Sequence, residues 1–175
     1  MVFYNAVSGE LLERVPTEHP VFTSRLVFSP DGSQLASSDW LGNIILWDVS
    51  SREPKGDPLA GPSGRVLDIL FTPDGKTLLA SYEILGGSVS SIGGQIRYWN
   101  TTTLEAEQIL PNPTTLPYSG MALTEDGRGV ITIQMGSTSL ALRDLNTFER
   151  IQGHFSENTL APRCMALSPS GRTLA

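Results

Sequence analysis

The chain has 175 residues and a formal net charge of −6 at neutral pH. This length suits one domain of ordinary size, and the acidic charge disfavours contact with phosphate backbones, so no nucleic-acid partner is expected. No apolar run approaches the roughly 20 residues of a membrane helix, and the N-terminus lacks the segments of a secretory signal. We therefore expect no membrane partner and a cytoplasmic location.

The composition favours strands and turns over helices. The chain contains 17 glycines and 12 prolines, and no window shows sustained helical periodicity. The sequence therefore predicts an all-β protein.

A hairpin motif recurs four times along the chain. Its copies are VFSPDG at 27–32, LFTPDG at 70–75, ALTEDG at 122–127 and ALSPSG at 166–171. In the first copy Pro30 fixes φ, Asp31 can accept hydrogen bonds from nearby amides, and Gly32 tolerates positive φ. We assign Asp31, Asp74 and Asp126 the same structural role of forming their turns.

A second motif alternates with the first. Its copies are Phe3–Asn5, Leu46–Asp48, Tyr98–Asn100 and Leu142–Asp144, each followed by a polar turn and a glutamate. Two motifs with a shared period of about 43 residues predict a four-stranded unit repeated along the chain.

Each unit is predicted to contain four strands in chain order. The first strands are nearly continuously apolar, which predicts burial on both faces: Arg25–Phe28, Val66–Phe71, Ser119–Leu123 and Arg163–Leu167. The second strands are Gln34–Ser38, Thr77–Ser81, Gly129–Gln134 and Arg172–Ala175. The third strands are Val2–Tyr4, Asn43–Trp47, Gln95–Trp99 and Ser139–Arg143. The fourth are more polar, as outer edges require: Leu11–Val15, Pro58–Ala60, Ala106–Leu110 and Phe148–Gln152.

These motifs resemble those of the WD-repeat family of β-propellers. The likeness is carried by FSPDGSQLA at 28–36, ILWD at 45–48 and Gly153-His154, and it covers essentially the whole chain. The segment 56–61 is similar to the outer strand and loop of bacterial members. The resemblance implies a propeller of about four blade equivalents: half-blades at 1–16 and 162–175, and complete blades at 21–60, 64–111 and 117–153.

Blades of this family often carry a structural hydrogen-bond network. It joins a histidine, a hydroxyl on the second strand, a tryptophan on the third strand and an aspartate in the turn between those strands. The resemblance gives His19, Ser37 and Trp47 these structural roles in the first full blade, but the aspartate position falls on Leu41, so a partial network is expected. Trp99 has the equivalent structural role in the second blade.

The later blades depart from this pattern. Arg143 replaces the tryptophan of the third blade, and no histidine precedes Val66 in the second. These departures predict blades of uneven stability.

The two half-blades are complementary. One supplies outer strands and the other supplies inner strands, so together they amount to one complete blade. Either the chain is part of a longer propeller, which we favour, or two chains pair head to tail and complete an eight-bladed ring.

The family's usual partner-docking face is formed by the turns between second and third strands and by the loops between blades. Candidate binding residues on it are Trp40, Tyr82, Ile84, Leu85, Tyr118 and Phe155. The turn at 82–94 is about eight residues longer than its counterpart in the first blade, so it is either a tolerated surface loop or an adhesive tip. Trp40 is either a binding residue or folded over its own blade.

Residues with catalytic chemistry are sparse. The two histidines are far apart in the sequence, no cluster has metal-ligand spacing, and the single cysteine lies in a strand-like run. We therefore expect no enzyme activity, cofactor or metal, and a scaffold that binds a protein or peptide partner. Two alternatives stay open: a propeller domain of a larger bacterial regulator or enzyme, which senses or positions its catalytic partner, and a ring that binds a small ligand or sugar.

Overall fold

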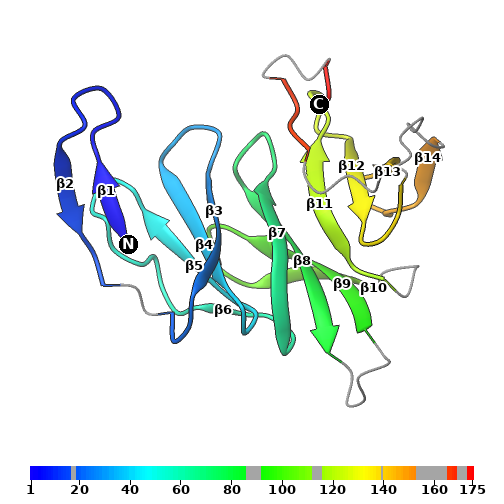
Figure 1. Cartoon of the computed structure of the whole chain (residues 1–175), viewed down its shortest axis with the longest axis horizontal. Helices are drawn as coiled ribbons and strands as arrows, with labels where there is room; N and C mark the ends of the chain where they lie inside the picture. Colours follow the sequence, from blue (N-terminus) through cyan, green and yellow to red (C-terminus); the bar gives the residue numbers. More distant parts are fainter. Residues whose placement is uncertain (17–18, 86–91, 112–115, 139, 153–164, 169–172) are drawn as a thin grey trace.

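The computed structural model describes residues 1–16, 19–85, 92–111, 116–138, 140–152, 165–168 and 173–175. Every regular element in this part of the chain is a β-strand, which confirms the predicted all-β class (Figure 1). Across the described residues, no helix of a length and apolar character suited to crossing a membrane is present.

The strands form antiparallel sheets whose order follows the chain. The first complete sheet contains β3 (Thr23–Phe28), β4 (Gln34–Asp39), β5 (Asn43–Asp48) and β6 (Leu59–Ala60). The second contains β7 (Gly64–Phe71), β8 (Thr77–Leu85), β9 (Ile92–Asn100) and β10 (Ala106–Pro111). The third contains β11 (Tyr118–Leu123), β12 (Gly129–Gln134), β13 (Leu140–Asp144) and β14 (Arg150–Gln152). A two-stranded sheet, β1 (Val2–Tyr4) and β2 (Leu11–Arg14), precedes them.

The sheets stand in a row and form an arc of propeller blades. The first strands β3 and β11 each contact β7, so the three inner strands lie side by side. The β1–β2 sheet lies at one end of the arc and the C-terminal residues lie at the other (Figure 1). We call the sheet that begins with β3 the first blade, and those that begin with β7 and β11 the second and third.

The hydrophobic core lies between blades, not within them. Strand β8 shows this best: Leu78, Ala80 and Tyr82 join a cluster shared with the first blade, whereas Leu79 joins one shared with the third. Trp47 and its neighbours pack in the same way against the β1–β2 sheet. Each blade therefore buries its apolar faces only against its neighbours, as in other repeat architectures.

The hairpin turns are held by the side chains that the sequence motif supplies. The hydroxyls of Ser29, Thr72 and Thr124 donate to Asp31, Asp74 and Asp126 respectively, each at 2.6 Å. Each carboxylate also accepts a backbone N–H two residues further along the chain. The hydrogen bond from Ser29 is the main reason that the pKa of Asp31 falls to about 2.

Two predictions about the strands were wrong. The first strand of the first blade, β3, is not buried on both faces, because Leu26 and Phe28 are more than half exposed. The insertion of the second blade is not simply a long turn after residue 81. It extends the hairpin instead, so that residues 82–85 continue β8 and residues 92–94 begin β9.

Candidate functional site

A buried network of four side chains stabilises the first blade. Ser37 lies at its centre: its Oγ is 2.8 Å from His19 Nε2 and accepts a hydrogen bond from Trp47 Nε1 at 2.8 Å. The opposite nitrogen of His19, Nδ1, lies 3.2 Å from Oδ2 of Asp39. Since all four residues are buried, each polar atom depends on these partners.

The prediction that this network is partial was wrong. Leu41 occupies the position at which the aspartate was expected, but Asp39 at the end of β4 supplies the carboxylate. Asp39 also accepts hydrogen bonds from the backbone N–H groups of Leu41 and Asn43 at 2.8 and 3.0 Å, and from Asn43 Nδ2 at 2.9 Å. Burial disfavours the ionised form of Asp39 and by itself raises its pKa. The hydrogen bonds from Asn43, Leu41 and His19 stabilise the carboxylate by more, so the pKa of Asp39 is lowered.

The other two blades alter this network. In the second, Ala80 takes the place of Ser37, and the buried Nε1 of Trp99 has no hydrogen-bond partner among the described residues. In the third, Arg143 replaces the tryptophan, and its Nε still reaches the strand hydroxyl of Thr132 at 3.4 Å. Its Nη1 also donates to the carbonyl of Phe148 at 3.1 Å.

The substitution Ala80→Ser is expected to raise the free energy of unfolding by about 1 kcal/mol. The new hydroxyl would stand where Ser37 stands in the first blade and would accept a hydrogen bond from Trp99 Nε1. Urea denaturation monitored by tryptophan fluorescence measures the change. The paired variant Ala80→Ser/Trp99→Phe should lose the gain, and an equal gain in both backgrounds would contradict the assignment.

Trp40 is an exposed aromatic residue in the turn between β4 and β5. Its side chain is 54% exposed, and that of the next residue, Leu41, is 53% exposed. The turn rests on the connection between β6 and β7, where Gly61 N donates to Gly42 O at 3.2 Å. Gly42 has φ of +96°, and a Cβ there would lie 2.4 Å from the carbonyl oxygen of Pro62. Only glycine fits this contact, so the backbone path of the turn that carries Trp40 depends on Gly42.

A charged pair from the second blade lies beside Trp40, and its arginine contacts the ring. The guanidinium of Arg65, near the start of β7, lies 5.5 Å from the ring centroid of Trp40. Arg65 Nη2 also lies 3.2 Å from Glu83 Oε2 on β8. Trp40 and Arg65 border a hollow of 340 Å³ between the first two blades. We call Trp40, Leu41, Arg65 and Glu83 the Trp40 face.

The structure separates the six predicted binding residues. Only Trp40 is exposed as expected. Tyr82 and Tyr118 are fully buried, contrary to their expected place on the docking surface, because Tyr82 packs in the core between the first two blades and Tyr118 lies edge-on to Phe148. Ile84 is half-buried against the same core as Tyr82. Phe155 and the side chain of Leu85 lie outside the described residues.

Sequence reasoning did not identify Arg65 or Glu83. Arg65 belongs to a different repeat from Trp40, and no local motif reports a contact between blades. The only feature of the sequence that could have drawn attention to Arg65 is its place as a basic residue directly before the predicted apolar strand Val66–Phe71. As regards metals, the described residues contain no group of three His, Cys, Asp or Glu side chains that could hold an ion.

A family model described as "WD domain, G-beta repeat" matches residues 12–48. This segment includes β3, β4, β5 and all four residues of the buried network. The match therefore covers the blade that holds the His19–Ser37–Trp47–Asp39 network.

Relatives extend the similarity further along the chain. It is 38% identical over 98 residues to the periodic tryptophan protein 2 homolog of Schizosaccharomyces pombe, which is 55% of this chain and 10% of the relative. It is 36% identical over 88 residues to human apoptotic protease-activating factor 1, covering 46% of this chain and 6% of the relative. It is 29% identical over 115 residues to Drosophila melanogaster actin-interacting protein 1, covering 57% of this chain and 18% of the relative.

The chain thus spans at most about a fifth of the length of these relatives. All three are eukaryotic proteins, so they give no support to the expectation of a bacterial-type member. Residues 12–48 match the model of a WD repeat, and the described residues have the fold of a WD-repeat β-propeller arc.

Proposed function

We propose that this chain is a non-catalytic scaffold that binds a protein or peptide through the Trp40 face. The observation that carries the proposal is the exposed indole of Trp40, which lies on a glycine-dependent turn beside the Arg65 guanidinium. The residues that dominate binding energy at protein interfaces are enriched in tryptophan, tyrosine and arginine. A fixed position also reduces the ordering cost of binding.

The names of two relatives support a role in binding other proteins. One is named for an interaction with actin and another for the activation of a protease. Because these relatives are several times longer than this chain, a second candidate is a propeller part of a larger regulator that positions a catalytic partner.

Selection of peptides from a random displayed library against the 175-residue chain tests the proposal. We expect enriched peptides whose affinity falls at least tenfold in Trp40→Ala, which corresponds to about 1.4 kcal/mol. Titration calorimetry measures the affinities, and Val7→Ala is the matched control, because Val7 is apolar and 99% exposed but lies in the β1–β2 turn. Failure to enrich any peptide, or equal losses in both variants, would reject the Trp40 face as the binding site.

A further inference from the structure

Two arginines from different blades line the hollow between the first and second blades. Arg25 lies on β3 and Arg65 on β7, and both border the 340 Å³ hollow beside Trp40. Val66 and Leu67 also contribute to its lining. A concave site with apolar walls and a few convergent charged groups is typical of a place where a specific ligand binds.

Ser24 ties the two blades together beside these arginines. Its Oγ lies 3.0 Å from Ser38 Oγ on β4 and 3.4 Å from the carbonyl oxygen of Val66 on β7. The strands β3 and β7 are also in direct contact. The backbone positions of Arg25 and Arg65 relative to each other are therefore set by the packing of two whole blades, which reduces the ordering cost of binding.

Each arginine has a carboxylate neighbour that leaves part of its guanidinium without a hydrogen bond. Arg25 Nη1 donates to the carbonyl of Ser24 at 3.1 Å, but its Nε lies 3.7 Å from Asp68 Oδ1, too far for a hydrogen bond. Arg65 Nη2 lies 3.2 Å from Glu83 Oε2, whereas its buried Nε has no hydrogen-bond partner among the described residues. A guanidinium carries five N–H donors, so an added acceptor in the hollow would be favoured.

The arginines lie closer to the surface than their carboxylate neighbours. The side chains of Arg25 and Arg65 are 47% and 39% exposed, whereas those of Asp68 and Glu83 are 21% and 15% exposed. An approaching partner therefore meets positive charge first, on a chain whose net charge is −6. The local charge suits a short acidic segment, while the net charge repels an extended polyanion such as nucleic acid.

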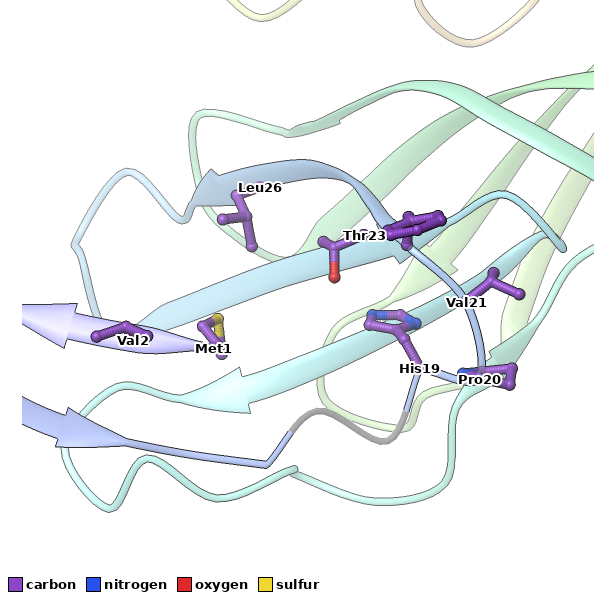
Figure 2. Close-up of a pocket in the computed structure, with 8 residues that line it drawn as sticks. Met1, Val2, His19, Pro20, Val21, Thr23 and Leu26 are labelled. Atoms are coloured by element: carbon purple, nitrogen blue, oxygen red, sulfur yellow. The ribbon is translucent and has the colours of Figure 1, made fainter.

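A larger hollow of 680 Å³ offers less specific chemistry. Its lining includes His19, Val21 and Leu26 (Figure 2). The two ring nitrogens of His19 already lie within hydrogen-bond distance of Ser37 and Asp39, so the imidazole is committed to the buried network. Val21 and Leu26 are exposed but apolar, and they do not select a partner by charge. The hollow between the blades is therefore the better-defined recognition site.

We propose that the Trp40 face binds an acidic peptide segment of a protein partner, and that a glutamate or aspartate of this segment lies between Arg25 and Arg65. This inference rests on the proposed function and names the chemistry of the partner. The guanidinium groups donate to the bound carboxylate, whose planar shape matches their fork. An apolar residue beside the acidic one packs on the exposed side chains of Trp40 and Leu41. Glu83 competes with the bound carboxylate for Arg65.

Three displayed peptide libraries test the preference for an acidic segment. They have the same random flanks and differ only at two central positions, which are fixed as glutamate, glutamine or lysine. The libraries are mixed in equal amounts and selected against the 175-residue chain at physiological salt, and sequencing counts the survivors. We expect glutamate peptides to outnumber glutamine peptides at least tenfold and lysine peptides to be depleted.

Two double variants locate this preference. In Arg25→Gln/Arg65→Gln the guanidinium groups are gone from the hollow, so glutamate and glutamine peptides should survive in equal numbers. The matched control is Lys76→Gln/Arg128→Gln, which removes the same charge from exposed residues. These residues lie in the turns between β7 and β8 and between β11 and β12, at the opposite end of the blades from the Trp40 turn. The control should keep the preference for glutamate.

Glu83→Gln is expected to change affinity in the opposite direction. It removes the internal competitor for Arg65, so the affinity for an enriched glutamate peptide should rise about threefold. The affinity for the same peptide with glutamine in place of glutamate should not change. Titration calorimetry measures both. If the Arg65–Glu83 pair only supports the fold, both peptides lose affinity in the variant, and this result would overturn the inference.

The selection separates this inference from the proposed function. If all three libraries are enriched equally and Trp40→Ala abolishes their enrichment, the face binds peptides without a charge preference, so the inference fails and the proposed function stands. A glutamate preference that the control variant loses as fully as Arg25→Gln/Arg65→Gln would reflect general attraction between charges and would also overturn the inference. If no library is enriched, or if enrichment is independent of Trp40, both fail.

Discussion

Replacing Asp39 with alanine is expected to lower the free energy of unfolding by about 3 kcal/mol. The variant leaves the backbone N–H groups of Leu41 and Asn43 and the Nδ1 atom of His19 without their acceptor. The side chains of His19 and Asp39 have no exposure, so the lost partner of His19 Nδ1 is not readily replaced by water. The midpoint and slope of urea denaturation measure the loss.

Two further variants show whether the loss of stability comes from this network or from the removal of any aspartate at the end of a strand. Asp39→Asn keeps one side-chain oxygen as acceptor and should lose less than Asp39→Ala. Asp48→Ala removes an aspartate that is also at the end of a strand but holds an exposed turn through Ser50 and Ser51. Its expected loss is below about 1 kcal/mol, and a loss as large as that of Asp39→Ala would argue against the network.

The strands could be predicted from the sequence because their signals are local. The Pro-Asp-Gly turn chemistry and the apolar runs beside it lie within about ten residues of each other. They predicted the strands of the first and third blades to within two residues. The turn aspartates followed from the same short-range pattern.

The burial of individual side chains could not be predicted in the same way, because it depends on contacts between blades that a local repeat motif does not encode. Tyr82 was expected in a turn, but the inserted residues extend β8, and extension of a strand places alternate side chains in the core between blades. Leu26 and Phe28 were expected to be buried, but their burial requires a neighbouring strand pair. Asp39 was missed because the network was aligned on the start of β5, whereas the carboxylate belongs to the end of β4.

Asp68 on β7 connects the three inner strands and carries the last prediction. Its Oδ2 accepts a hydrogen bond from Met121 N on β11 at 2.7 Å, and its Oδ1 lies 3.7 Å from Arg25 Nε on β3. Burial raises the pKa of Asp68 to about 6, despite the opposing effects of the Met121 N–H and of Arg25. The folded protein therefore holds this proton at a pH where the unfolded chain, with a pKa near 3.8, has lost it.

The sign of the pH dependence follows from linkage. A raised pKa in the folded state contributes stability that is complete below about pH 4 and is lost as the pH rises through about 6. In Asp68→Asn the side chain is neutral throughout and keeps an acceptor for Met121 N. We expect the variant to match the parent near pH 4 and to exceed it by up to about 3 kcal/mol at pH 7.5. Urea denaturation of both proteins across this range measures the difference, in which the titrations of all shared groups cancel. A difference that stays constant with pH would show that folding does not raise the pKa of Asp68, and that the hydrogen bond from β11 and the charge of Arg25 offset burial.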